Sequence, residues 1–463
     1  MTIDQEFPGL TATTTPQQAA AQTAYVYGLA CVAALAGLLF GFDTAVINGA
    51  IVFLKQQLRL TDAQTETAAT SLLIGCMAGA AIAGFLADRF GRRRILLQSA
   101  VLFCVSSVWT ALPNSLGQFV LARFVAGLAI GVASVVAPMY IAEIAPPHIR
   151  GILVTLYQMA IVTGILASYF INWLLAGLGP NSWRWMFATA AAPSLAFFIA
   201  LLFIPESPRW LFRWNRAGGA LAVLTRVSGP AEAEKQAEEI RSSLAEETGS
   251  WRELLEPRLR RPIAVAALLA VFSQITGINT VIYYGTLLLK EHGGFGKSSD
   301  AFGANVLIGF VNFAVTIAAI GLIDKIGRKP LLLCGVAGMT CALLGLSSAF
   351  SASPVPAARV LTLLLIYVGC FAFSLGPGTW VYISEIFPTA VRGRAMSIAT
   401  LSLWLACAFV TWTFLSLIGW FGATGAFRIF AGICVVTFLF IFLALPETKG
   451  RTLEQIGRSW GGH

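Results

Sequence analysis

The chain has 463 residues, of which 57% are hydrophobic and 11% are charged, and its mean hydropathy is +0.77. This composition excludes a soluble protein, because so few charged groups cannot cover a surface that faces water. The net charge of +9 needs no nucleic-acid partner to explain it, because most Lys and Arg residues gather between apolar runs, as they do in membrane proteins.

Twelve apolar runs of about 20 residues or more predict twelve transmembrane helices. They lie near 24–50, 67–87, 95–113, 118–142, 151–177, 184–204, 262–289, 301–323, 331–350, 360–384, 394–418 and 425–445. Runs of this length are typical of helices, whereas the strands of outer-membrane barrels are short and alternate in polarity. The predicted fold is therefore an all-α membrane protein.

Polar stretches divide these runs into two sets of six. We expect an N-terminal tail at 1–23, a six-helix bundle at 24–204, a linker at 205–258, a second six-helix bundle at 259–445 and a C-terminal tail at 446–463. Within the linker, residues 231–241 mix Glu and Lys without runs of Pro or Gly. This pattern favours a short cytoplasmic helical segment over a loose linker.

The distribution of basic residues predicts the orientation. If both termini are cytoplasmic, most Lys and Arg residues fall on the inner side, as the positive-inside rule requires. Residues 1–23 contain Asp4 and Glu6 but no basic residue, so we do not expect a cleavable signal peptide. The chain has no Asn-x-Ser/Thr acceptor, which fits a bacterial inner membrane.

Three motifs recur in the same order at nearly the same offset. Residues 86–93 (LADRFGRR) return at 322–329 (LIDKIGRK), residues 140–151 return at 382–393, and Pro-Glu-Ser at 205–207 returns as Pro-Glu-Thr at 446–448. A duplicated six-helix unit explains this repetition. Parallel repeats with a substrate site between them are a transporter architecture.

Asp43 lies in the second half of the first apolar run, far from any other charge in the sequence. A carboxylate inside a membrane is costly and marks a candidate functional site, although a helix-end residue or a structural ion pair are the plainer alternatives. Arg123, near the start of the fourth run, is the one available cation near that depth in the same half. A buried Asp needs a partner, so we expect the two to pair.

Charged residues also mark the predicted cytoplasmic ends of the helices. The set with its repeat mates is Asp88, Arg92, Glu143 and Arg150 in the first half, and Asp324, Arg328, Glu385 and Arg392 in the second. The basic members can anchor to anionic lipid headgroups. Because all lie at one side, we also expect ion pairs across the two halves that close the inner side.

This combination of motifs resembles the sugar porter family of the major facilitator superfamily. The resemblance rests on Pro205–Leu211 (PESPRWL), Pro446–Arg451 (PETKGR) and the two Asp-x-x-Gly-Arg-Arg/Lys turns, and it spans about residues 35–457. The pattern is most similar to bacterial sugar–proton symporters of the xylose type and to glucose facilitators. It implies twelve helices in two pseudo-symmetric bundles, and an inner ion-pair network that holds the outward-facing state.

The resemblance also implies sites. Asp43 and Arg123 match the proton-coupling pair of the symporters, whereas facilitators carry Asn in place of the Asp. The residues that match the sugar site are Phe40, Gln158, Ile165, Gln274, Asn279, Asn312, Trp380 and Trp404, and those that match the outer gate are Tyr283 and Tyr284. Hydroxyl-bonding amides beside aromatic faces suit a sugar, although a single buried Gln or Asn can also join helices.

Two features refine this site. Gly376-Pro377-Gly378 ahead of Trp380 is expected to break its helix, as happens where backbone lines a cavity. Ile165 stands where the xylose-type symporters have Gln and the glucose facilitators have Ile, and Ser273 and Leu403 replace amide side chains. This less polar site favours a hexose, glucose first, and leaves pentose, galactose or a polyol open.

We therefore expect a proton-coupled monosaccharide importer that works by alternating access. The alternatives are a passive facilitator and, more remotely, a non-transporting sugar sensor. No pattern for a metal, a nucleophile or a phosphate cradle appears, so neither an enzyme nor a cofactor is expected. The expected partners are a monosaccharide, a proton and membrane lipids, with no nucleic acid, and the protein should work as a monomer.

Overall fold

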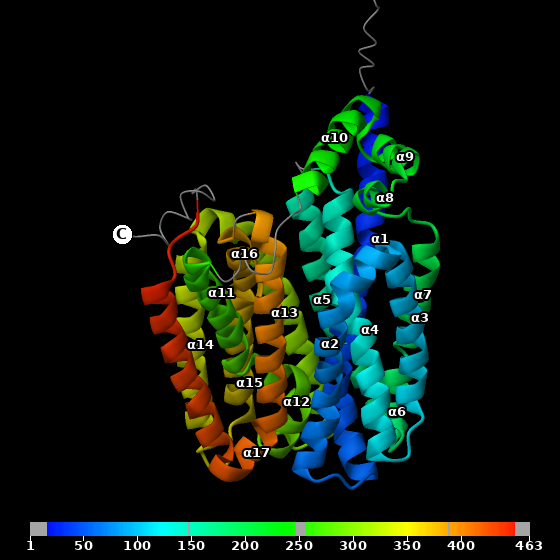
Figure 1. Ribbon diagram of the computed structural model, residues 1–463. Helices are drawn as coiled ribbons and strands as arrows, with labels where there is room; N and C mark the ends of the chain where they lie inside the picture. The colour runs from blue at the N-terminus through cyan, green and yellow to red at the C-terminus, as the bar shows by residue number, and fades with distance from the viewer. Residues whose placement is uncertain (1–15, 147–148, 247–255, 388, 450–463) are drawn as a thin grey trace, which may run out of the picture.

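The computed structural model describes residues 16–146, 149–246, 256–387 and 389–449, and these residues fold almost entirely into helices. Two helical bundles stand side by side, and short helices cover one end of the first bundle (Figure 1). The first bundle contains α1 (Pro16–Gln57), α2 (Asp62–Phe90), α3 (Arg92–Ala111), α4 (Leu116–Ile144), α5 (Arg150–Leu175), α6 (Ser182–Ala188) and α7 (Ala191–Leu202).

The second bundle contains α11 (Pro257–Ile275), α12 (Ile278–Glu291), α13 (Ser298–Ile326), α14 (Arg328–Phe350), α15 (Ala357–Phe373), α16 (Leu375–Glu385) and α17 (Thr389–Ala444). Three pairs of helices, α6 with α7, α11 with α12 and α15 with α16, each occupy one expected span. We call the two bundles the N-half and the C-half.

Eleven helical stretches of the described chain are long and apolar enough to cross a membrane. The last of them, Arg394–Ala444, has 51 residues, more than twice what one crossing needs. Its backbone leaves the helical conformation at Gly422, where φ is 66°, and there the chain turns back (Figure 1). It therefore holds both the eleventh and the twelfth expected spans, and the prediction of twelve membrane-spanning helices is confirmed.

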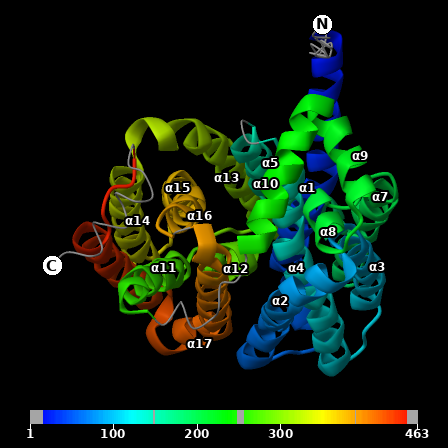
Figure 2. The ribbon, with the colours of Figure 1, turned by 45° about the horizontal axis from the view of Figure 1, so that its top comes forward.

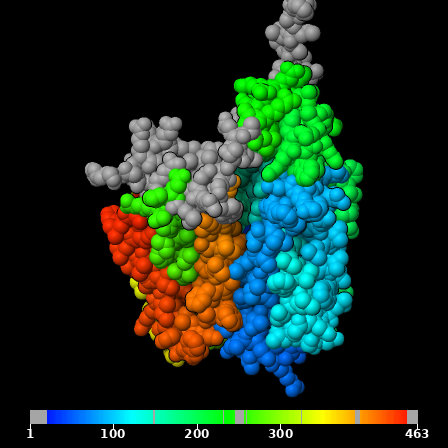
Figure 3. All heavy atoms as spheres, viewed as in Figure 1, coloured from blue at the N-terminus to red at the C-terminus, as the bar shows by residue number. Residues whose placement is uncertain are grey.

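The linker folds into α8 (Pro208–Arg213), α9 (Ala217–Ser228) and α10 (Pro230–Glu246). These helices enclose a small apolar cluster that includes Phe212, Leu224 and Ala237. They lie over the N-half and away from α14 and α15 (Figure 2), and they rise above its surface in the space-filling view (Figure 3). We call this side of the molecule the linker end and the opposite side the far end.

Several helices extend beyond the apolar runs that predicted them. The first begins at Pro16 and ends at Gln57, whereas the apolar run covers 24–50. Six of the eight residues before the apolar run are Ala or Gln, which form helices readily in water. The second begins at Asp62, where the hydroxyl of Thr61 accepts a hydrogen bond from the Gln64 N–H and the Gln64 side chain accepts one from the Thr61 N–H.

Small residues allow the close packing of α2 against α4. A Cβ atom at Gly127 would lie 2.1 Å from the carbonyl oxygen of Leu72, and one at Gly75 would lie 2.2 Å from that of Phe124. Helices in lipid gain little from burying apolar surface against each other, so close backbone contact supplies much of their attraction. This packing fixes the segment of α4 that carries Arg123.

The duplicated motifs fold into duplicated contacts at the linker end. The Glu206 carboxylate accepts the backbone N–H groups of Arg92 and Arg93 at 2.8 and 3.1 Å, at the start of α3. The Glu447 carboxylate accepts those of Arg328 and Lys329 at 3.1 and 3.0 Å, at the start of α14. In both halves a carboxylate thus satisfies the free N–H groups of a helix N-terminus.

These contacts influence the ionisation of Glu447. Burial alone raises the pKa of its carboxyl, but backbone N–H groups of Lys449, Arg328, Lys329 and Thr448 donate to it and hold the pKa below its usual value. The charged form therefore stabilises the folded state.

Candidate functional site

The centre of the candidate site is an ion pair inside the N-half. The Arg123 guanidinium on α4 donates to the Asp43 carboxylate on α1 at 2.8 Å and to the Asp43 backbone carbonyl at 3.0 Å. Asp43 is 3% exposed and Arg123 is fully buried. The partner that the sequence predicted for Asp43 is therefore in place.

The pair is not fully satisfied by the protein. Among the described residues, neither the second carboxylate oxygen of Asp43 nor the Nε of Arg123 has a hydrogen-bond partner. The guanidinium carbon of Arg123 lies 5.0 Å from the centre of the Phe187 ring, within the range of a cation–π contact. One oxygen of Asp43 is thus held by Arg123, while the other has no partner among the described residues.

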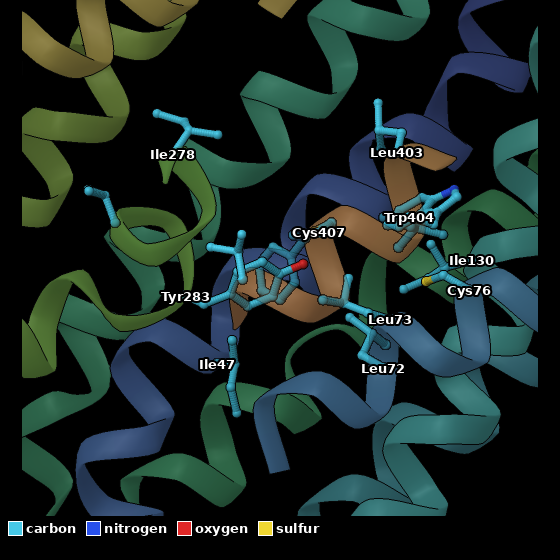
Figure 4. Packing of buried hydrophobic residues seen from close by; sticks show 14 of the residues in the cluster. Ile47, Leu72, Leu73, Cys76, Ile130, Ile278, Tyr283, Leu403, Trp404 and Cys407 are labelled. Atoms are coloured by element: carbon cyan, nitrogen blue, oxygen red, sulfur yellow. The ribbon is translucent and has the colours of Figure 1, made fainter. Parts of the chain in front are cut away.

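Two aromatic rings meet between the halves close to this pair. Phe40, one turn before Asp43 on α1, lies with its ring centre 5.6 Å from that of Trp404 on α17. Trp404 is among the buried residues drawn in Figure 4, together with Leu403 one position earlier. Phe40 and Trp404 come from different halves, so their contact depends on how the halves sit against each other.

Gln274 and Asn279 lie on either side of a break in the seventh span. Gly277 separates α11 from α12 in the left-handed conformation, with φ 97°, and a Cβ there would lie 2.9 Å from the Phe430 ring. The Asn279 amide donates to Gln274 at 2.5 Å, and the Gln274 amide donates to the Ser273 hydroxyl at 3.0 Å. This break was not expected from the sequence, and it brings the two amides together.

The remaining sugar-site candidates are less closely connected. Gln158 on α5, Asn312 on α13 and Trp380 on α16 are partly buried, and none of these three described side chains hydrogen-bonds to another candidate. Ile165 packs in an apolar cluster with Ala45 and Tyr169. A shared sugar site for these residues stays a prediction.

The expected break near Trp380 falls slightly earlier in the chain. Ser374 has φ −121° and ψ −87° and separates α15 from α16, so Gly376, Pro377 and Gly378 occupy the first turn of α16 instead. Pro fits the first turn of a helix because the N–H that it lacks would have no partner there. The break exists, but the residue that makes it is Ser374.

Both gate candidates are buried at the interface of the halves. Tyr283 on α12 extends its ring toward Cys407 on α17 (Figure 4). The Tyr284 hydroxyl donates to the backbone carbonyl of Thr411 at 2.8 Å. Neither ring is open to solvent, so the site is covered on this side.

A further polar contact, missed in the sequence, joins the halves nearby. The Asn48 amide of α1 donates to the Ile282 carbonyl at 2.8 Å and accepts the Thr286 N–H at 2.7 Å. These two groups of α12 are four residues apart, so Asn48 occupies a position where the helix would bond to itself. The sequence offered one signal of this contact: Asn48 is a polar residue in the same apolar run as Asp43, one and a half turns after it.

The inner charged residues form pairs within each half. Arg92 lies 3.1 Å from Asp88 and 2.9 Å from Glu143, and Arg328 lies 2.7 Å from Glu385. The Ser207 hydroxyl also donates to Glu143, as the Thr448 hydroxyl does to Glu385 at 2.6 Å.

Among the described side chains of the expected network, Arg150 adds no ion pair between the halves. The Arg150 guanidinium donates to the Ala145 carbonyl at 3.4 Å, and the side chains of Asp324 and Arg392 lie outside the described part of the chain. Pairing between the halves therefore stays a prediction, and the described pairs brace each half separately.

Comparison with known proteins places these features in a family. The family described as "Sugar (and other) transporter" matches residues 29–460. The chain is 40% identical to the arabinose-proton symporter of Bacillus subtilis, over 94% of this chain and 95% of that protein. It is 38% identical to the D-xylose-proton symporter of Escherichia coli, over 95% of this chain and 96% of that protein.

The same comparison identifies a close structural relative. The fold matches the inward open conformation of the xylose transporter XylE from Escherichia coli with a TM-score of 0.83 and 35% identity, over 94% of this chain and all of that one. The two-bundle architecture expected from the repeats is confirmed by this match.

Proposed function

Because the chain belongs to the sugar transporter family, whose members are transporters and not enzymes, we propose that it is a proton-coupled monosaccharide symporter that works by alternating access. The observation that carries this proposal is the buried ion pair of Asp43 with Arg123, which leaves one carboxylate oxygen without a partner. The two relatives described above are named as proton symporters, which supports the same reading.

The ion pair suggests how a proton enters the cycle. Burial favours the neutral form of a carboxyl group, and a nearby guanidinium favours the charged form. If Arg123 moves away as the helices shift, Asp43 is left without its charged partner and takes up a proton. If Arg123 returns, it displaces that proton, so each proton transferred is tied to one change of conformation.

The position of these residues on α1 links the proton to the sugar and to closure. Phe40, Asp43 and Asn48 lie within nine residues, and the helix rises about 12 Å from Phe40 to Asn48. Phe40 contacts Trp404 of the C-half, and Asn48 bonds to α12. A shift of α1 would therefore affect the aromatic contact, the proton pair and the far-end contact together.

We place the sugar between the halves, near Phe40, Trp404 and the Gln274–Asn279 pair. Rings can stack on the C–H faces of a sugar while amides bond to its hydroxyl groups. Ile165 favours a hexose, glucose first, whereas the arabinose and xylose symporters among its relatives favour the pentose alternative. Competition of a panel of sugars against labelled glucose and labelled xylose decides between them.

We further propose that the linker end faces the cytoplasm of a bacterial cell, with both chain termini on that side and the protein in the inner membrane. The basic residues of the linker end support this orientation through the positive-inside rule. The units of the monomer would be bundles at 24–204 and 259–445, joined by the linker at 205–258. The far end, with Asn48 and Tyr284, would then be the outer side.

Uptake into proteoliposomes tests the proposal. With an inward-directed proton gradient, the wild-type chain should accumulate labelled sugar above the external concentration. Asp43→Asn should abolish accumulation but preserve sugar counterflow, because binding and alternation do not need a titrating group. Sugar uptake that ignores the gradient in the wild-type chain would instead establish the passive facilitator.

A further inference from the structure

Glu66, near the start of α2, is a buried carboxylate that the transport mechanism above does not use. It is 2% exposed although it lies only one turn from the exposed Asp62 at the far end. Within the described part of the chain no basic side chain pairs with it. The nearby Lys55 pairs instead with Asp62 at 2.9 Å and with Glu291 at 3.4 Å. Something other than an ion pair must hold this charge.

Its partners are backbone and hydroxyl groups of the opposite half. One carboxylate oxygen of Glu66 accepts the Ser416 backbone N–H at 2.7 Å, and the other accepts the Ser416 hydroxyl at 2.7 Å. Both donors belong to α17, so Glu66 connects α2 of the N-half to the C-half.

Neighbouring backbone groups of α17 bond to both other helices. In an α-helix the N–H of residue 416 bonds to the carbonyl of residue 412. Here the Ser416 N–H donates to Glu66 at 2.7 Å, and the Thr411 carbonyl accepts the Tyr284 hydroxyl at 2.8 Å. The backbone of α17 thus bonds to an acceptor on α2 and to a donor on α12.

We infer that Glu66 is a positioning residue that latches the far end of the transporter shut. The inference rests on the alternating access proposed above, because a latch has a role only if that end also opens. When the end opens, α2 and α17 must part, and the carboxylate loses both Ser416 donors at once. A hydroxyl can donate or accept, so the contact needs one carboxyl oxygen that accepts the Ser416 N–H and a second oxygen that bonds to the hydroxyl.

A pair of spin labels across the far end tests the latch directly. Positions 117 on α4 and 299 on α13 are exposed and lie in opposite halves. Because the chain has eight native Cys residues, the labels should be attached to a ketone-bearing amino acid instead. Distances between the labels, measured by double electron–electron resonance on the full chain in nanodiscs without sugar, give the ratio of open to closed far ends.

Glu66→Ala should raise that ratio about tenfold, equivalent to about 1.4 kcal/mol. Ser416→Ala should shift it in the same direction, and the double variant should shift it no further than Glu66→Ala alone, because both changes remove the same contact. Thr67→Ala, which removes an exposed hydroxyl on the same helix, should leave the ratio unchanged.

Wild-type distances in Glu66→Ala, or an equal shift in Thr67→Ala, would overturn the latch. If Glu66→Ala fails to fold, the Ser416→Ala variant decides alone, since it removes one hydroxyl from a partly exposed position. The measurement needs neither sugar nor a proton gradient. Its result therefore tests the latch even if the protein does not couple sugar to protons.

Discussion

The Asp43–Arg123 pair yields a prediction that separates stability from coupling. Arg123→Leu removes two hydrogen bonds, to the Asp43 carboxylate at 2.8 Å and to its backbone carbonyl at 3.0 Å, and leaves the carboxylate buried alone. Breaking a buried ion pair from one side costs about 3–5 kcal/mol, whereas replacing both partners is often nearly neutral. The single variant should therefore unfold at a clearly lower temperature than the double variant Asp43→Asn with Arg123→Leu.

The cycle compares the wild type, Asp43→Asn, Arg123→Leu and the double variant. Their thermal unfolding in one detergent is followed by the loss of the monodisperse peak in size-exclusion chromatography. The double variant should regain most of the stability lost by Arg123→Leu, yet it should not couple sugar to protons. A double variant as unstable as the single one would show that the loss comes from packing around Arg123, including Phe187, and not from an unpaired charge. That result would refute the electrostatic reasoning.

Three further predictions concern the packing, the sugar site and the linker end. Gly127→Leu should prevent folding, because the new Cβ would lie 2.1 Å from a carbonyl oxygen of α2. Gly84→Leu should fold, because the space around Gly84 is open. The amount of each protein extracted in detergent compares the two variants. Gln274→Ala should weaken sugar binding at least about tenfold in calorimetric titration by leaving a sugar hydroxyl without a partner, and exposed Gln98→Ala should not. Glu447 has a lowered folded-state pKa, so its stabilising effect is present above the unfolded value of 4.5 and is lost as the pH falls through the folded value. Glu447→Gln should therefore unfold at a lower temperature than wild type at pH 7, with the difference shrinking toward pH 4; a constant difference would contradict this reasoning.

The fold could be predicted because lipid leaves few options. Long apolar runs must be helices, and repeated motifs such as Pro205–Ser207 and Pro446–Thr448 revealed two equivalent halves. The partner of Asp43 could also be found by elimination, since Arg123 was the one suitable cation. These inferences use composition and sequence spacing, which a single chain displays directly.

Contacts between the halves could not be predicted in the same way. Asn48 and Glu66 bond to backbone groups of α12 and α17, and a backbone N–H or carbonyl leaves no signature in the sequence. The break at Gly277 was equally hidden, because a Gly in a span serves close packing as often as a left-handed turn. The inner residues Arg92 and Arg328 were expected to pair across the halves; the pairs that the structure describes lie within each half, and pairing across them stays a prediction.

The central claim is that sugar and proton move together through Asp43. The most direct measurement is the external pH of a weakly buffered suspension of proteoliposomes when sugar is added outside. No proton gradient and no membrane potential are imposed beforehand. The account predicts that sugar entry makes the external medium more alkaline in the wild-type chain and leaves its pH unchanged in Asp43→Asn, with both proteins still exchanging sugar. Equal alkalinisation in the two proteins, or none in the wild type while sugar enters, would contradict it.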